Sequence, residues 1–137
     1  MVNCLRYSHA VKILIHKSNN NYESARSDFK AGRYDTCVSG LYYACFQVVV
    51  ALMILKGQTE TKHTHVRAFV NKEIARKGLI EMRLVKFYNK IMEDRSDADY
   101  SSTITFEKNT VEVLVELSIE FKEAIIKLIE NESLESN

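Results

Sequence analysis

Apolar residues recur every three to four positions through most of the chain, which predicts a series of helices. The first is expected over residues 11–31, where six apolar side chains share one face: Val11, Leu14, Ile15, Tyr22, Ala25 and Phe29. The run Asn19-Asn20-Asn21 weakens its middle, because asparagine favours turns over helix interiors. Gly32 fits the left-handed position that ends such a helix.

The second predicted helix, over residues 35–56, is apolar on nearly its whole circumference. Asp35 is placed to cap its start and Gly57 to end it. A helix that is apolar all round is either surrounded by other helices or shared with a second subunit. Its apolar stretch, residues 41–55 with Gln47 inside, is short for a bilayer. We therefore expect no membrane association.

Three further helices are predicted, one short and two long, over residues 64–78, from 79 or 80 to 95, and 106–129. Thr64 and Thr105 are placed as caps for the short and the last helix. Residues 98–105 are expected to form a loop and residues 132–137 to fray. The predicted fold class is all-α: an up-and-down antiparallel bundle of four long helices plus one short helix.

Composition agrees with one helical domain. The 137 residues suit a single domain over 1–137, with its core at about 11–130. No proline and only four glycines argue against an all-β chain, which needs frequent turns. The three cysteines are an odd number and residues 1–15 lack a signal peptide's apolar stretch, so we expect a cytoplasmic protein. Cys37 and Cys45 are expected in the core.

Charge is unevenly distributed, although the net charge of the chain is only +1. Residues 62–90 hold eight Lys or Arg against two Glu, a net charge of +6. Residues 93–137 hold twelve acidic residues against four basic ones, a net charge of −8. The third and fourth helices therefore offer a basic stripe to an anionic partner. The alternative is a solvated face balanced by the acidic last helix packed beside it.

Few residues are spaced for chemistry. His63 and His65 lack the further ligands that zinc needs, so we expect no metal and no cofactor. The segment from Arg95 to Tyr100 gathers an arginine, two aspartates and a tyrosine. Arginine grips phosphate with two parallel hydrogen bonds, while Asp99 is placed to orient it and Tyr100 to stack on a base. The alternative is an ion pair that anchors the end of a helix.

Several blocks together resemble the HEPN domain family, whose name stands for higher eukaryotes and prokaryotes nucleotide-binding. They are Tyr42-Tyr43-Ala44-Cys45-Phe46, Lys62-His63-Thr64 leading to Val66-Arg67-Ala68-Phe69, Lys77-Gly78-Leu79-Ile80, and Arg95 through Tyr100 with Phe106-Glu107 beyond. The resemblance spans about residues 14–130, in the family's order. Its most specific part is the pairing of the first block with Arg-Ser-Asp-Ala-Asp-Tyr some fifty residues later.

The resemblance implies a helical bundle that forms a homodimer. Many members are encoded beside a minimal nucleotidyltransferase, and the two act as toxin and antitoxin. Some members are metal-independent ribonucleases, whereas others only bind nucleotide or RNA. These properties make a nucleotidyltransferase partner and a nucleotide or RNA ligand the expectations for this chain.

The chain departs from the family's nuclease motif, an arginine followed four to six residues later by a histidine. Arg95 matches the arginine, but Tyr100 stands where the histidine is expected and no histidine follows His65. Members of the family often carry an arginine shortly before the Tyr42-Tyr43 block, where this chain has Gly40. Many also carry a histidine directly after the block's phenylalanine, where this chain has Gln47. His63 matches a histidine of the family's second loop. Tyrosine is a poor base at neutral pH because its unperturbed pKa is about 10.

The leading hypothesis is a HEPN-domain protein that binds nucleotide or RNA phosphates through Arg95, Asp99 and Tyr100, without strong catalysis. The first alternative is a metal-independent ribonuclease toxin that uses Arg95, with Tyr100 or His63 moving the protons. A second subunit is one route by which His63 reaches Arg95. The second alternative is a non-catalytic protein-interaction module whose basic stripe docks a partner protein.

Overall fold

The structure is a computed structural model that describes the backbone of residues 2–135 and the side chains of residues 9–133. Its elements in chain order are α1 (Val2–Lys30), α2 (Tyr34–Leu55), α3 (His63–Phe69), the π-helical segment η1 (Val70–Ala75), α4 (Met82–Tyr100) and α5 (Lys108–Glu135). The described residues contain no strand, so the predicted all-α bundle is confirmed.

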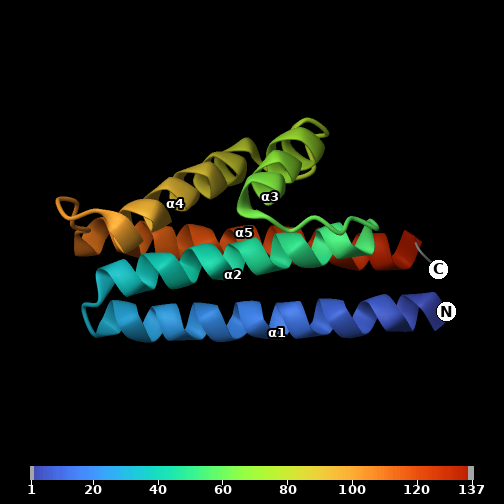
Figure 1. Cartoon of the computed structure of the whole chain (residues 1–137), viewed down its shortest axis with the longest axis horizontal. Helices are drawn as coiled ribbons and strands as arrows, with labels where there is room; N and C mark the ends of the chain where they lie inside the picture. Colours follow the sequence, from blue (N-terminus) through green and yellow to red (C-terminus); the bar gives the residue numbers. More distant parts are fainter. Residues whose placement is uncertain (1, 136–137) are drawn as a thin grey trace.

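The bundle has a long layer and a crossing layer (Figure 1). Helices α1, α2 and α5 run nearly side by side, and α4 crosses them at an angle together with the shorter α3. Helix α2 lies at the centre, because it packs against α1, α5 and α4. The first and last described residues lie at the same end of the molecule.

The apolar circumference of α2 is explained within one chain. Twelve of its residues are buried, and they include Leu41, Tyr42, Cys45 and Met53. Of the two explanations open at the sequence level, burial by neighbouring helices is therefore sufficient for α2. Among the described residues α2 is also the one helix long and apolar enough to cross a membrane by length and composition, and most of it is buried in the bundle.

Helix α1 continues without a break through the three asparagines, contrary to the expected weakening. Two of them make hydrogen bonds to other helices. Asn21 Nδ2 donates to Gln47 Oε1 of α2 at 2.9 Å, and Asn19 Oδ1 accepts from the buried Lys122 Nζ of α5 at 2.9 Å. These inter-helix bonds offset the poor helix propensity of asparagine.

The predicted start of the first helix at residue 11 is wrong, because α1 already begins at Val2. The end of α1 and both ends of α2 lie within one residue of their predicted positions, but the predicted side-chain caps are wrong. Gly32, Gly57 and Gly78 have φ of +77°, +81° and +63°, as expected of residues that end helices. Asp35 does not cap α2, which starts at Tyr34, and α3 starts at His63 rather than after a Thr64 cap. Neither helix start has a side-chain cap hydrogen bond.

The last two helices are displaced toward the C-terminus relative to prediction. Helix α4 starts at Met82 and continues to Tyr100, so residues 98–100 are helical rather than part of a loop. Helix α5 starts at Lys108 and reaches Glu135, so Thr105 lies outside it and the expected fraying of residues 132–135 is not seen. Residues 136 and 137 lie outside the described part of the chain.

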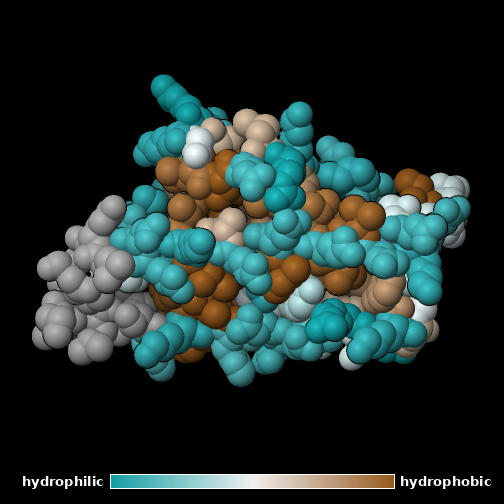
Figure 2. Space-filling model, turned by 180° about the vertical axis from the view of Figure 1, so that it is seen from behind, coloured by the Kyte–Doolittle hydropathy of each residue, from teal (hydrophilic) through white to brown (hydrophobic). Residues whose placement is uncertain are grey.

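The surface is polar over most of its area, with apolar surface showing along the middle of the rear face (Figure 2). The large apolar side chains that are most exposed are Ile13, Leu79, Met82, Tyr100, Ile104 and Val113. Exposed apolar surface of this kind is where other molecules can bind.

Candidate phosphate-binding site between α2, α3 and α4

Arg95 lies on the core-facing side of α4 rather than at a helix end. It continues the row of Tyr88 and Ile91, because residues three and four positions apart share a face of a helix. Its guanidinium carbon lies 5.2 Å from the ring centroid of Tyr42 and 5.8 Å from that of Tyr43. The aromatic faces of α2 therefore hold this cation beside the bundle core.

The polar contacts of Arg95 leave part of its donor capacity unused. Its Nη1 pairs with Asp99 Oδ2 at 3.4 Å, one helical turn further along α4. The Arg95 side chain is 14% exposed. Its Nε is buried and has no hydrogen-bond partner among the described residues. A buried donor without a partner is costly, so this guanidinium is set to gain from an anionic ligand.

His63 is brought to the same tyrosine from the start of α3. Its Nδ1 lies 2.6 Å from the Tyr42 hydroxyl oxygen, and its ring stacks on Phe46 with centroids 4.5 Å apart. The His63 and Tyr42 rings are themselves 5.6 Å apart. His63 and Arg95 thus contact one tyrosine within a single chain, and no second subunit is required to bring them together.

Burial sets the protonation of this cluster. It lowers the pKa of His63 below its ordinary value, and the charge of Arg95 lowers it further. Burial raises the pKa of the Tyr42 hydroxyl, which therefore stays protonated at neutral pH. A neutral imidazole in hydrogen-bond contact with a neutral phenol is the resulting state, with Arg95 as the nearby cation.

Tyr100 does not join this cluster. It is 77% exposed at the last residue of α4. Because α4 stays helical to its end, five residues at about 100° each turn Tyr100 well away from the direction of Arg95. The predicted loop over residues 98–105 includes Tyr100, whereas the structure keeps this residue in α4. Asp99 remains one turn from Arg95 and forms the ion pair.

Tyr42, Tyr43 and Phe46 are site residues that the sequence pattern did not predict, although their block is part of the resemblance to the family. Their role as the aromatic wall depends on which face of α2 meets α4, a property of the packing. The available signal was the density of aromatic residues in one helical turn and a half. A tyrosine suits such a position, because its ring packs on the apolar core while its hydroxyl can reach solvent or a hydrogen-bond partner.

The basic stripe is only partly neutralised. Arg83 pairs with Glu120 of α5 at 2.9 Å, and Lys77 and Lys90 pair with acidic residues one turn away. Four exposed cations of the stripe make no ion pair in the described part of the chain: Lys62, Lys72, Arg76 and Lys86. The acidic last helix therefore neutralises the stripe only in part, and uncompensated positive charge remains on this surface.

Metal binding and cysteine chemistry are two further functions that the described residues can be checked for. No group of three or more His, Cys, Asp or Glu is arranged to hold a metal ion there. Burial raises the pKa of both the Cys37 and the Cys45 thiol to about 12. The thiolate is the reactive form, so neither cysteine suits a nucleophile. The Cys4 side chain lies outside the described side chains.

Comparison with known proteins agrees with this architecture. Residues 11–131 match the model of the HEPN domain, and the chain belongs to the HEPN family. It is 36% identical over 109 residues to a "UPF0332 protein" of Thermotoga maritima, covering 80% of this chain and 83% of that protein. It is 31% identical over 111 residues to "Putative toxin MJ0142" of Methanocaldococcus jannaschii, covering 81% and 76%.

Proposed function

We propose that this HEPN protein is toxin-like and binds nucleotide or RNA phosphates at Arg95. The observation that carries the proposal is the setting of that guanidinium, stacked on Tyr42 and Tyr43, paired with Asp99, and with a buried Nε that lacks a partner. A planar cation held in one orientation suits bidentate contact with a phosphate. The toxin-like character rests on the name of the Methanocaldococcus relative.

The surroundings favour a nucleotide over a simple anion. Tyr43, whose ring centroid lies 5.8 Å from the guanidinium carbon, is only partly buried, so some ring surface is available beside the guanidinium. Bases stack on such rings regardless of sequence, at about 1–3 kcal/mol per base. The unpaired cations of the basic stripe would extend the contact to neighbouring phosphates of an RNA strand. Tyr100 lies outside the aromatic cluster around Arg95, so the proposal does not rest on it.

A minimal nucleotidyltransferase is the proposed protein partner, in a toxin–antitoxin pair. This part rests on membership of the family rather than on a particular contact. Co-expression with the nearest encoded nucleotidyltransferase, followed by size-exclusion chromatography of the purified proteins, tests it. A shared peak of defined stoichiometry supports the pairing, and separate elution of the two proteins contradicts it.

Arg95→Ala is the decisive variant for binding. It should weaken binding of a fluorescein-labelled single-stranded RNA by about 1.5–3 kcal/mol, the scale of hydrogen bonds to a charged group. Arg95→Lys should also lose affinity, since lysine cannot make the bidentate contact. Fluorescence anisotropy at fixed salt measures both. Arg26→Ala on α1 makes the same change of charge away from the site and should bind like wild type. Equal affinity of Arg95→Ala and Arg26→Ala would refute the assignment.

A metal-independent ribonuclease is the second candidate, and the placement of His63 favours it. In the tautomer whose Nδ1–H donates to the Tyr42 oxygen, Nε2 is unprotonated and able to accept the proton of a 2′-hydroxyl. We expect weak cleavage or none, because the family's motif histidine is missing. Incubation with RNA at pH 7–8 without metal is the test. Strong cleavage lost in both Arg95→Ala and His63→Ala would replace the binding proposal by the enzymatic one.

A further inference from the structure

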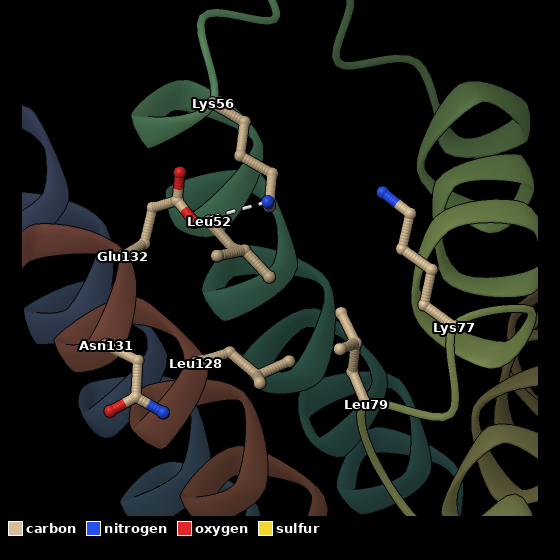
Figure 3. Close-up of a pocket in the computed structure, with 7 residues that line it drawn as sticks. All are labelled: Leu52, Lys56, Lys77, Leu79, Leu128, Asn131 and Glu132. Atoms are coloured by element: carbon tan, nitrogen blue, oxygen red, sulfur yellow. Dashed lines mark hydrogen bonds and ion pairs between the residues drawn. The ribbon is translucent and has the colours of Figure 1, made fainter. Parts of the chain in front are cut away.

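A recess lies toward the C-terminal end of α2, away from Arg95. It is a pocket of about 240 Å³ lined by Leu52, Lys56, Lys77, Leu79, Leu128, Asn131 and Glu132. Figure 3 shows the ends of α2 and α5 on one side and the segment after η1 on the other. Leu52 is ten residues from Tyr42, which is about 15 Å along a helix. The pocket is therefore separate from the candidate phosphate site.

The floor of the pocket is made of leucines. Leu52, Leu79 and Leu128 gather at its base in Figure 3. Leu79 is 41% exposed. It precedes α4 in a non-helical stretch and is not part of the buried core. An exposed apolar side chain beside other apolar lining residues marks a place where another molecule can bind.

The recess continues along α5 as a groove. A second hollow of about 480 Å³ shares Leu79, Leu128 and Asn131 with the first and extends to Leu84 and Ala124. From residue 124 to residue 132, α5 rises about 12 Å. That length accommodates roughly two turns of a helix, enough for apolar side chains at positions i, i+3 or i+4, and i+7.

Both lysines and glutamates line the groove. Lys56, Lys77 and Lys127 are the cations, and the two carboxylates, Glu132 and Glu81, are paired with Lys56 and Arg83. In Figure 3 the Lys56 and Lys77 side chains extend into the mouth from opposite walls. Lys56 Nζ pairs with Glu132 at 3.2 Å and Lys77 Nζ with Glu73 at 3.1 Å. The Lys77 pair is 60% and 47% exposed, so little free energy is lost when Lys77 turns to an incoming carboxylate. Lys127 is exposed and makes no ion pair among the described residues.

We propose that this groove binds an acidic, leucine-bearing helical segment of a partner protein. The apolar side chains of the segment would lie on Leu52, Leu79 and Leu128. Its carboxylates would meet Lys77 and Lys127 at the rim. An RNA strand is disfavoured, because the groove offers neither an arginine nor an aromatic ring for phosphate or base. The proposal does not depend on nucleotide binding at Arg95.

The test uses a labelled peptide as the probe. It has leucines at i, i+4 and i+7 with glutamates between them, and a matched peptide replaces every glutamate by lysine. We expect the acidic peptide to bind the full chain with a Kd below about 100 μM and the basic peptide at least tenfold more weakly. Leu79→Asp and Lys77→Glu should each weaken the acidic peptide by about tenfold or more.

Matched controls separate the groove from general effects. Lys72→Glu makes the same change of charge as Lys77→Glu, at an exposed position of η1 that does not line the groove. It should leave peptide binding within about twofold of wild type. Leu79→Asp should leave the circular dichroism spectrum and RNA binding at Arg95 unchanged. Loss of peptide binding at the groove can therefore be told apart from loss of RNA binding at Arg95.

Several results would overturn the proposal. They are absence of binding up to about 1 mM acidic peptide, equal affinity for the basic peptide, and insensitivity to Leu79→Asp. Competition of RNA with the peptide would assign the groove to nucleic acid instead. A homodimer that dissociates on Leu79→Asp would make a second copy of the chain the occupant.

Discussion

At the scale of single residues, the informative contact is between Tyr42 and His63. A hydrogen bond of 2.6 Å and three neighbouring rings hold the imidazole of His63 in one orientation. Burial and the nearby Arg95 both oppose a positive charge there. The same contacts that support a ligand site therefore make this histidine sensitive to acid.

His63 should make the folded protein less stable in acid. Because its pKa is lowered on folding, the unfolded chain binds this proton more readily. Well above the ordinary histidine pKa of about 6.5, His63 is neutral in both states and does not change the free energy of unfolding. As the pH falls from that value through the lowered pKa of the folded protein, the unfolded chain takes up the proton first and the free energy of unfolding decreases. Urea denaturation at pH 8 and pH 5 measures the loss.

The comparison variant is His63→Gln, which does not titrate. The fall in unfolding free energy between pH 8 and pH 5 should be smaller in this variant than in wild type, since the carboxylates contribute equally to both. His65→Gln, at an exposed position two residues on, should retain the full decline. Identical declines in wild type and His63→Gln would show that the imidazole is not held as described.

At the scale of elements, the close approach of α1 and α2 decides the shape of the long layer. A Cβ atom on Gly40 would lie 3.2 Å from the Ala25 Cβ and 3.5 Å from the Asn21 carbonyl oxygen. The absence of a side chain at Gly40 lets the two helices meet there.

Gly40→Val should therefore destabilise the fold, by about 1–3 kcal/mol, the usual cost of overpacking. The effect opposes helix propensity, which favours any ordinary residue over glycine by less than about 1 kcal/mol. Chemical denaturation followed by circular dichroism gives the value. Thr36→Val, at an exposed position of the same helix, is the control and should change stability little. Unchanged or increased stability of Gly40→Val would mean that α1 moves aside freely.

At the scale of the whole molecule, the question is whether the chain forms a homodimer and through which surface. The expectation of a homodimer drew on the apolar circumference of α2, but α1, α4 and α5 cover that helix within one chain. The remaining support is the family and the apolar surface exposed elsewhere, which includes Ile13 at 43% and Val113 at 52%. We propose that the chain is a homodimer that associates through a surface other than α2.

Sedimentation equilibrium at micromolar concentration should give twice the mass of the chain. Because apolar contacts are insensitive to screening, the dimer should persist at about 1 M salt, where the Debye length is near 3 Å. Dissociation at high salt would instead point to ionic contacts between the subunits. A monomer at tens of micromolar in ordinary buffer would contradict the proposal.

The sequence by itself determined the helices, their glycine ends and much of the core, because these depend on local periodicity and on the conformational freedom of single residues. It also drew attention to Arg95 and Asp99, whose spacing of four holds on any helix. Only the tertiary structure decided that His63 and Arg95 meet at Tyr42, that Tyr100 turns to solvent, and that α2 needs no second subunit. Those outcomes depend on which faces of distant helices pack together, and no local pattern encodes that choice.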